Sequence, residues 1–405
     1  MTKNDDKRIP ALRFKGFNDD WAQQELKDLV SFYSGLTYHP EDIKSTGVFV
    51  IRSSNIKHGQ LVNADNVYVD PKSVNSTYVR KKDIIVVVRN GSRNLIGKHA
   101  QVHNDISKSV IGAFMTGIRS NNNDFISALF DSDKFRKEIH KNLGATINQI
   151  TTGEFKKMIF PTPQTLNEKE KIGNLISQIN SLVSLQQRKL KQVELLKKYL
   201  LQNLFPTKNE KNAKLLFKGH KEIWREQKAN DIFTEVDTRK VPDNTILSTT
   251  QNGKVVPRNS LGRNLVFSTS KLKNYKLVRS GQFIIHLRSF KGGFATSSLT
   301  GIVSPTYTIF DFKNRTKHDT KFWSILFTNY NFIQSLKSVT EGIRYNGIAI
   351  KFSQFSDLKI SFPQLSTQMD ISKIINCLNL SLEKQKLKIQ KLQKTKQFLL
   401  QNMFI

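Results

Sequence analysis

The sequence predicts a fold of the α/β class, more narrowly α+β, in which two mixed globular segments are separated by two long helices. The chain has 405 residues, which is enough for two or three domains of ordinary size. Short sequence matches recur in the same order about 200 residues apart, so the chain is built as an internal repeat. Each copy ends in a segment whose apolar residues recur with a period near 3.5, the pattern of a helix that packs against another helix.

The repeat is marked at its start, middle and end. A Phe-Lys-Gly triplet at 14–16, followed by Trp21, recurs at 217–219 with Trp224, an offset of 203. A Phe-Pro pair leads into the helical pattern of each copy, at 160–161 and at 362–363. The helices close on Leu-Leu-Gln-Asn-Leu-Phe at 200–205 and on Leu-Leu-Gln-Asn-Met-Phe at 399–404. Ordered matches at three places are not expected by chance.

These matches divide the chain into five segments. They are a first globular domain at 1–163, a first helix at 164–205, a polar linker at 206–214, a second globular domain at 215–363 and a second helix at 364–405. Within the globular domains, runs of β-branched and aromatic residues predict strands at 48–51, 84–88, 282–287 and 307–310. Helical stretches are expected near 125–143 and 321–336.

Both helical segments can be written in heptads with matching positions. The a positions, taken as the helix-pairing residues, are Ile172, Ile179, Gln186, Val193 and Leu200 in the first copy and Ile371, Leu378, Gln385, Leu392 and Leu399 in the second. The d positions of the first copy are Leu175, Leu182, Lys189, Leu196 and Asn203, and a flanking apolar column holds Ile176, Val183, Leu190 and Leu204. Helices of this kind would be about 50–60 Å long. Because such an apolar stripe needs a partner, we predict that the two helices pair antiparallel as a coiled coil about a pseudo-two-fold axis.

A glutamine occupies the same a position in both copies, Gln186 and Gln385. A buried polar residue at such a position usually fixes the register of the pair at some cost in stability. The alternative is that each glutamine lies at a partly exposed crossing of the helices. The sequence leaves both readings open.

The charge of the chain indicates a polyanionic partner. Lys and Arg number 64 against 33 Asp and Glu, which gives a formal net charge of +31 and a pI near 10.0. Residues 1–163 carry +7 and residues 206–363 carry +15, whereas the two helical segments carry +4 and +5. Nucleic acid is therefore the expected partner, ahead of an anionic membrane surface. If the second domain neutralises about five phosphates, log K should fall with log[salt] at a slope of about −4 to −5.

Several protein classes are excluded by composition. Cys377 is the single cysteine, so neither a disulfide framework nor a cysteine-based zinc site is expected. The first residues lack the apolar core of a signal peptide. The longest aliphatic run, at 84–88, is far shorter than the roughly 20 residues that span a bilayer. We therefore expect a soluble, cytoplasmic protein without a membrane partner.

Catalytic motifs are not found in the sequence. The chain has no Pro-Pro pair, which the amine-binding loop of amino-methyltransferases requires, and no phosphate-binding glycine loop ending in Gly-Lys-Ser or Gly-Lys-Thr. His99 and His103 are four residues apart, but an ordinary surface pair is favoured over a metal site because no carboxylate accompanies them. Asp243 could begin a nuclease motif, but no Glu-x-Lys follows at a usable spacing. We expect no metal site and no catalysis by this chain.

The ordered motifs resemble those of a known family over nearly the whole chain. They are Leu-Arg-Phe-Lys-Gly-Phe at 12–17 with Trp21, the approaches to the helices at 155–163 and 355–364, the two helix ends, and Gly-Ile-Val-Ser-Pro-Thr-Tyr at 301–307. Together they resemble the specificity (S) subunit of Type I restriction–modification systems, which are found in the bacterial cytoplasm. The resemblance implies that the two globular domains are target recognition domains. Each would read one half of a bipartite, asymmetric DNA site in the major groove.

The resemblance also implies the partners. The two helices would set the length of the unspecified spacer and dock two methyltransferase (M) subunits, and two restriction/translocase (R) subunits would complete the complex. S-adenosylmethionine, ATP and Mg²⁺ would be used by those partner subunits, and this chain would bind no cofactor. Base flipping and adenine methylation would belong to the methyltransferase.

The DNA-binding residues are expected where basic and amide side chains follow apolar strands. In the first domain these are Arg52 and Asn55 after one strand, and Arg89, Asn90, Ser92, Arg93 and Lys98 after another. In the second they are Arg258 and Arg263 beside the turn at 252–253, and Arg288, Ser289 and Lys291 after the strand at 282–287. The alternative for each is an exposed loop residue or a phosphate contact. The phenylalanines are assigned mainly to the cores, which leaves Tyr38 and Tyr345 as aromatic candidates.

Two other functional classes were weighed against a DNA-specificity subunit. A stand-alone enzyme such as a nuclease is disfavoured by the missing motifs, and cleavage or methylation by the purified chain with cofactor would support it. A coiled-coil scaffold that binds RNA or acidic proteins would bind without sequence preference and would weaken steeply with salt.

Overall fold

The computed structural model describes residues 9–104, 106, 108–143, 148–207, 210–219, 224–241, 244–250, 253–261, 272–286, 293–333 and 351–405. The chain falls into two compact units. The first comprises Met1–Arg188 and Lys386–Ile405, and the second comprises Lys189–Gln385. Both boundaries lie within the long helices, so each unit combines one globular segment with parts of both helices. The sequence divided the chain differently, with each helix as a segment of its own.

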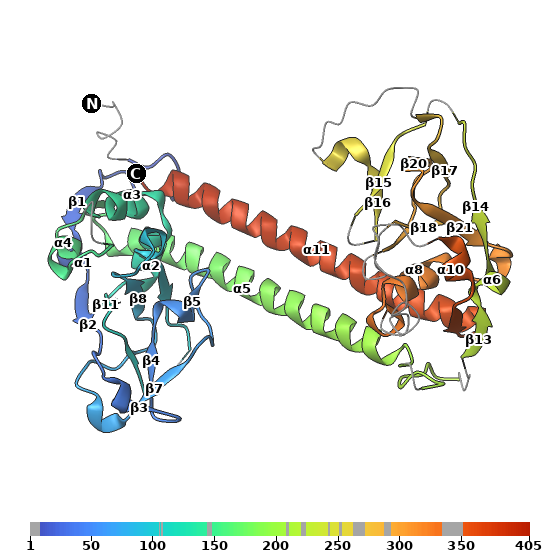
Figure 1. Ribbon diagram of the computed structural model, residues 1–405. Helices are drawn as coiled ribbons and strands as arrows, with labels where there is room; N and C mark the ends of the chain where they lie inside the picture. The colour runs from blue at the N-terminus through green and yellow to red at the C-terminus, as the bar shows by residue number, and fades with distance from the viewer. Residues whose placement is uncertain are drawn as a thin grey trace. The chain divides into compact units, whose positions relative to one another are not determined.

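The first unit contains two four-stranded sheets and two short ribbons (Figure 1). One sheet has the order β2 (Ser31–Ser34), β11 (Met115–Arg119), β8 (Ile84–Val87), β9 (His99–Gln101), and the other has β10 (Ser109–Ile111), β4 (Val48–Ile51), β7 (Val67–Val69), β3 (Ile43–Lys44). The ribbons pair β1 (Ala22–Glu25) with β12 (Ile159–Thr162) and β5 (Ile56–Lys57) with β6 (Gln60–Leu61). All pairings are antiparallel except β10 with β4. The helices of this unit are α1 (Leu26–Leu29), α2 (Asn123–Asp131), α3 (Asp133–Asn142), α4 (Thr152–Lys156), the first part of α5 (Leu166–Asn203) and the last part of α11 (Leu365–Met403).

Strand β8 explains the aliphatic run of the sequence. Its four residues are all fully buried, and alternate side chains face opposite sides of the sheet. Ile84 and Val86 belong to the core beneath the helices, whereas Ile85 and Val87 belong to a separate core on the other face. A strand covered on both faces needs apolar residues at every position, so the run does not alternate.

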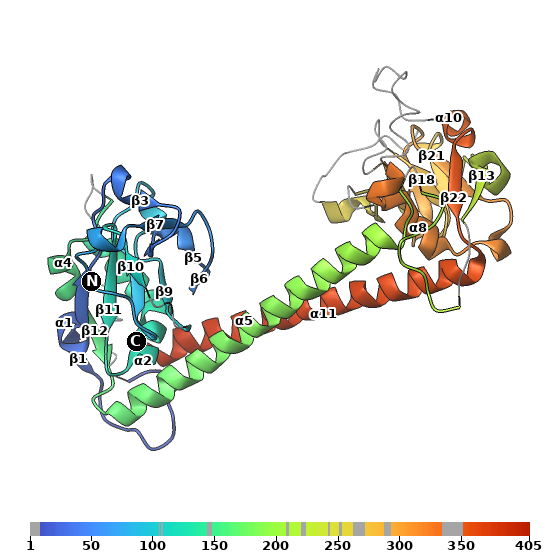
Figure 2. The same cartoon turned by 90° about the horizontal axis from the view of Figure 1, so that it is seen from below.

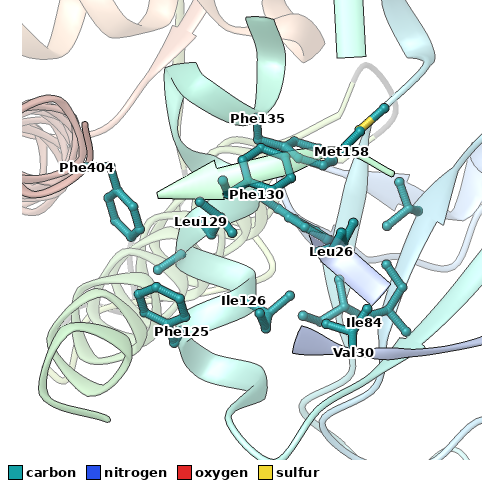
Figure 3. Packing of buried hydrophobic residues seen from close by; sticks show 14 of the residues in the cluster. Leu26, Val30, Ile84, Phe125, Ile126, Leu129, Phe130, Phe135, Met158 and Phe404 are labelled. Atoms are coloured by element: carbon teal, nitrogen blue, oxygen red, sulfur yellow. The ribbon is translucent and has the colours of Figure 1, made fainter. Parts of the chain in front are cut away.

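The predicted helix near 125–143 is two helices, because Ser132 separates them. The Ser132 hydroxyl donates to the Leu129 carbonyl at 2.6 Å and accepts from the Phe135 amide at 3.4 Å, so it ends α2 and begins α3. The turn brings the rings of Phe130 and Phe135 into a stack with centroids 4.1 Å apart (Figure 3). Both rings lie in the main core of the first unit.

The second unit repeats this plan. Its sheet has the order β14 (Phe233–Val236), β21 (Thr308–Phe312), β18 (Phe283–Ile285), β19 (Phe294–Thr296), which matches β2, β11, β8, β9 strand for strand. Its ribbon pairs β13 (Arg225–Lys228) with β22 (Lys359–Phe362), as β1 pairs with β12 (Figure 2). Two more ribbons pair β15 (Leu247–Thr249) with β16 (Val255–Pro257) and β17 (Lys276–Val278) with β20 (Gly301–Val303). The helices are α6 (Ala229–Ile232), α8 (Thr320–Thr328), α10 (Phe352–Ser356) and the first part of α11 (Leu365–Met403).

Short 3₁₀ turns complete the described elements of the two units. They are η1 (Pro40–Asp42), η2 (Ser53–Asn55), η3 (Pro71–Ser73), η4 (Arg93–Leu95), η5 (Arg258–Leu261) and η6 (Arg315–Lys317). The matching sheet order, ribbons and terminal helices confirm the predicted fold class and the internal repeat.

The turn before the central strand shows how the two copies diverged while keeping one geometry. In the first unit, the buried Asp83 accepts from the Arg80 amide at 2.9 Å and from two nitrogens of Arg119 at 2.9 Å each. In the second, Gln282 occupies the same place, 199 residues later, and accepts from the Arg279 amide at 2.8 Å. The same backbone turn is therefore held by a carboxylate in one copy and by an amide in the other.

The long helices pair in opposite directions within each unit. In the first unit, Ile172 and Ile176 near the start of α5 share a core with Leu400 and Met403 at the end of α11. Phe404, just after α11, lies over Phe125 of α2 (Figure 3). In the second unit, Ile371 and Ile375 near the start of α11 share a core with residues at the end of α5. The predicted antiparallel pairing is confirmed.

The a, d and flanking columns of the heptads differ in burial. None of the ten predicted helix-pairing residues is exposed, and Gln186 is only 8% exposed. The d positions Leu182, Lys189 and Leu196, however, face outward, and the flanking column is buried or half-buried instead. At the start of α5, Ile172 of the a column and Ile176 of the flanking column lie in the core of the first unit, and Leu175 of the d column packs against it.

The two glutamines of the a column differ in burial. Gln186 is buried, whereas Gln385 is half-buried and its Oε1 atom has no hydrogen-bond partner among the described residues. A register role for this pair stays a prediction. Within the described part of the chain, no helix is both long enough and apolar enough to span a membrane.

The lowered pKa values of two histidines in the second unit predict that the stability of this unit depends on pH. Burial lowers the pKa of His286 to about 4, and burial with the charge of Lys317 lowers that of His318 to about 4. The unfolded value is about 6.5, so the unfolded chain binds the protons more readily. The contribution of each histidine to stability is fully present above about pH 6.5 and is lost as the pH falls towards 4.

The variant His318→Phe tests this pH dependence. His318 stacks on Phe312 with ring centroids 4.9 Å apart, so a phenyl ring keeps the packing and removes the titration. Thermal unfolding between pH 7 and pH 4.5 should show a smaller loss of Tm in the variant than in the wild type. Equal losses in both proteins would contradict the prediction.

Candidate nucleic-acid interface

Three loops of the first unit meet at one edge of its sheets. Strands β4 and β10 run parallel and end together, and the end of β8 lies beside the start of β11. Because β10 leads directly into β11, the loops at 52–55, 89–93 and 112–114 converge. We call the residues Arg52, Arg89, Asn90, Ser92, Arg93, Lys98 and Phe114 of these loops and their flanks the basic loop cluster.

Hydrogen bonds join the loops to one another. The Asn90 side chain donates to the Ser53 hydroxyl at 3.1 Å, and Lys98 Nζ donates to the Ser53 carbonyl at 3.2 Å. The carbonyl of Phe114 accepts from the amides of Val88 and Arg89, at 3.0 and 3.2 Å. The structure therefore brings together the two loops that the sequence selected independently in this domain, and adds a third.

The loop at 89–93 is a closed turn. The Asn90 side-chain oxygen accepts a hydrogen bond from the Ser92 backbone amide at 3.0 Å. The Asn90 backbone amide donates a hydrogen bond to the Asn148 carbonyl at 3.2 Å. The Asn148 side chain donates to the Gly91 carbonyl at 3.0 Å. This bonding fixes the backbone and leaves Gly91, Ser92 and Arg93 exposed. A fixed loop that presents exposed polar side chains loses little conformational entropy on binding.

Three of the four cations in the basic loop cluster are held by neighbours. Arg52 forms an ion pair with Asp65 at 2.6 Å, Arg93 Nη2 donates to the Leu143 carbonyl at 3.3 Å, and Lys98 donates to Ser53. Burial, together with the charge of nearby Lys57, lowers the pKa of Lys98. Arg89 instead lies with its guanidinium carbon 5.1 Å from the centre of the Phe114 ring.

Two residues differ from the expectation. Asn55 is 1% exposed, and its side-chain amide donates to the Ala64 carbonyl at 2.6 Å and to Asn66 at 3.1 Å. It therefore organises the loop that follows β4, and this placement disagrees with a direct contact to DNA. Phe114 was missed, because the sequence assigned phenylalanines to the cores, yet it is 53% exposed. Its position in a Gly-Ala-Phe turn between two strands was the available signal.

Of the five candidates in the second unit, the structure describes Arg258. Arg263, Arg288, Ser289 and Lys291 lie outside the described residues, as does Tyr345. Arg258 begins η5, where its amide donates to the Ile246 carbonyl at 2.9 Å and its Nη1 donates to the Tyr275 hydroxyl at 3.5 Å. In the sequence, Arg288 follows β18 as Arg89 follows β8, at an offset of 199.

A groove of about 700 Å³ lies beside the loops of the first unit, between β9, the β5–β6 ribbon and the parts of α5 and α11 in that unit. Asp131 of α2 lines it, with Lys396 of α11 at 2.7 Å and His99 Nε2 at 3.5 Å. Burial alone would raise the pKa of Asp131, but the hydrogen bonds and charges of His99 and Lys396 outweigh it and hold that pKa well below its usual range. This ion pair fastens the end of α11 to the first globular segment.

The side chains of the basic loop cluster have the chemistry of a nucleic-acid interface. The described residues include no group of three or more His, Cys, Asp or Glu side chains that could hold a metal ion. His99, one of the pair considered for a metal, is engaged with Asp131, and His103 is exposed. Lysine and arginine side chains suit phosphates, and arginine, asparagine and serine in a fixed loop suit base edges.

Comparison with known proteins finds similarity to the same family by sequence and by fold. Residues 18–195 match the family model of the Type I restriction modification DNA specificity domain. The specificity subunit of the Type I restriction enzyme EcoKI from Escherichia coli (strain K12) is 28% identical over 176 residues, which cover 40% of this chain and 38% of that protein. The StySPI specificity subunit from Salmonella potsdam is 27% identical over the same length and the same shares. The match therefore spans about two fifths of the length of either relative.

A solved structure extends the likeness to both copies of the repeat. The crystal structure of the S subunit of a Type I restriction–modification system from M. genitalium aligns with a TM-score of 0.63 and covers 98% of this chain and 99% of that chain. The sequences are 13% identical over this alignment, so the likeness is one of fold.

Proposed function

Because this chain carries the Type I restriction–modification DNA specificity domain at residues 18–195 and shares the fold of an S subunit over nearly its whole length, we propose that it is the DNA-reading subunit of such a system. The basic loop cluster is the observation that carries the proposal within the chain itself. It presents arginine, asparagine and serine side chains from a hydrogen-bonded turn at one edge of the sheets. In this role the chain selects the sequence and does not itself cut or methylate DNA.

The two globular segments would read the two halves of a bipartite site. They share one fold but differ in the residues at equivalent places, as Asp83 and Gln282 illustrate. Different side chains on one framework predict two different half-sites. Lysine and arginine contacts to phosphate would supply most of the affinity, and contacts to base edges in the major groove would supply the selectivity.

The long helices would set the spacer between the half-sites. Helix α5 has 38 residues and α11 has 39, which corresponds to about 57 Å of helix. Each of them belongs partly to the first unit and partly to the second. Continuous helices resist bending and stretching, so they are suited to fix a distance between two readers.

The outward faces of the helices would dock the two methyltransferase subunits. The large apolar side chains that α5 exposes are Leu166, Leu182, Leu185, Leu195, Leu196 and Tyr199, and those that α11 exposes are Met369, Leu380, Leu387 and Phe398. Such residues are costly to leave in water and indicate a protein partner. The methyltransferase would bring S-adenosylmethionine, and two restriction/translocase subunits would bring the ATP- and Mg²⁺-dependent activity.

Mapping of methylated adenines tests the proposal directly. A strain that carries the cognate methyltransferase is compared with and without this gene. We expect one bipartite motif to be methylated only when the gene is present, and gel shifts with the chain plus methyltransferase to be selective for that motif. Absence of any gene-dependent motif, together with binding that ignores sequence, would overturn the proposed function. Methylation or cleavage by the purified chain alone would contradict its non-catalytic role.

A further inference from the structure

Arg89 differs from the other cations of the basic loop cluster because it is paired with an aromatic ring, that of Phe114. Phe114 is a large apolar side chain that is 53% exposed, and the Arg89 guanidinium carbon lies 5.1 Å from the centre of its ring. Both residues are exposed, so the pair is part of the surface. The pair therefore presents an apolar ring and hydrogen-bond donors side by side on the surface.

The backbone beneath this pair is fixed. The Phe114 carbonyl accepts hydrogen bonds from the amides of Val88 and Arg89, and the Met115 amide donates to the Gly112 carbonyl at 2.9 Å. The turn is also anchored by β11, which pairs with both β8 and β2. The ring and the guanidinium are therefore carried on one rigid support, and each restricts the rotamers of the other.

The polar atoms of Arg89 are available for a ligand. Among the described residues, no side chain or carbonyl accepts a hydrogen bond from its guanidinium, in contrast to Arg52 with Asp65 and Lys98 with Ser53. An arginine whose planar fork is oriented by an aromatic ring is ready to donate two parallel hydrogen bonds. Guanine presents the matching pair of acceptors, O6 and N7, in the major groove.

The ring of Phe114 adds an apolar surface next to that fork. The apolar group that a base pair exposes in the major groove is the C5 methyl of thymine, and phenylalanine is one of the residues that contacts it. We propose that Arg89 and Phe114 form a joint reader of two neighbouring bases, in which Arg89 binds a guanine and Phe114 packs on the C5 methyl of an adjacent thymine. This inference rests on the proposed function and names residues that determine specificity in the first half-site.

Base analogues test the inference one atom group at a time. Duplexes carrying the bipartite motif are bound to the complex of this chain with its methyltransferase, and each thymine of the first half-site is replaced in turn by deoxyuridine, which lacks only the methyl group. We expect one replacement to weaken binding about fourfold, the effect of losing one buried methyl-sized group. The Phe114→Ala complex should bind the thymine and deoxyuridine duplexes equally, whereas Phe114→Leu should keep part of the difference.

The arginine is tested in the same way with 7-deazaguanine, which lacks the N7 acceptor. The wild type should lose about tenfold in affinity at one guanine next to that thymine. Arg89→Lys keeps the charge but not the fork, so it should lose the dependence on N7 while the slope of log K against log[salt] stays unchanged. The matched control is Ile159→Ala, which removes a similarly exposed apolar side chain from the β1–β12 ribbon and should behave as wild type.

The outcomes separate this inference from the proposed function. If the wild-type complex binds without sequence selectivity, the proposed function fails and the inference fails with it. If binding is selective but no thymine depends on Phe114, or if the first half-site has no thymine beside a guanine, the inference alone is overturned. If Arg89→Lys leaves the N7 dependence intact, the arginine does not read that guanine and the joint reader is likewise overturned.

Discussion

Replacing residues 213–363 with the corresponding segment of another S subunit is expected to change one half of the recognised DNA sequence and to leave the other half unchanged. The spacer should also keep its length, because the exchange leaves the whole of α5 and α11 in place. This is the largest effect that the proposed function predicts, since one half-site would be replaced completely. Methylome mapping of strains that carry the parent and the exchanged chain measures all three features at once.

The structure supplies the physical reason why such an exchange can fold. The second globular segment opens with β13 and closes with β22, and these strands pair antiparallel along their full length. The segment therefore begins and ends at one place, next to the ends of the two helices. Its core includes Ile371 and Ile375 of α11, so the donor segment must present apolar residues where Trp224 and Phe362 now lie.

The reciprocal exchange of residues 1–163 is the matched control. It should change the other half-site only, because β1 and β12 close the first segment in the same way. A change in both half-sites after either exchange would contradict independent reading by the two segments. A folded, methylation-competent chimera with an unchanged motif would contradict any role of the exchanged segment in reading DNA.

Inserting seven residues into both helices, after Gln187 in α5 and after Lys386 in α11, is expected to lengthen the spacer by about one to three base pairs. Seven helical residues add about 10 Å and fall only about 20° short of two full turns, so the buried stripe stays on nearly the same side. The length added equals about three base pairs of DNA, and the twist of the duplex limits which spacers fit. The positions correspond in the two copies at an offset of 199.

Two controls accompany the insertion. Seven residues placed in the linker at 206–214, outside the helices, should leave the spacer unchanged. Seven residues placed in α5 alone should lower the Tm, because the buried columns of the two helices would no longer match. An unchanged spacer in a stable double-insertion protein would refute the role of the helices in setting it.

Local patterns predicted those elements whose structure is decided by neighbours in the sequence. The apolar run at 84–88 gave strand β8, and the heptads gave helices that begin and end within three residues of the predicted bounds. The two polar loops after β4 and β8 were found because turn residues follow apolar strands in both places. In each case, the residues that specify the element lie within a few positions of one another.

The failures concern properties that depend on distant parts of the chain. Leu182 and Leu196 are exposed although the heptad pattern places them in an apolar column. Asn55 is buried because the loop at 62–66 folds back over it, and its amide hydrogen-bonds there. Phe114 is exposed although, among the described residues, the 12 largest fully buried side chains are all Phe or Trp, so residue type alone assigned it to a core.

The sequence by itself determined the internal repeat, the two long helices, the basic character of the globular segments and the family resemblance. Each of these depends only on which residues occur and in what order, and the sequence contains both. The tertiary structure alone decided which residues share a surface. The parallel pairing of β4 with β10 and the antiparallel pairing of β8 with β11 place three separate loops at one sheet edge. Strand pairing joins residues tens of positions apart, and therefore only the folded chain shows that Arg89 and Phe114 form one surface.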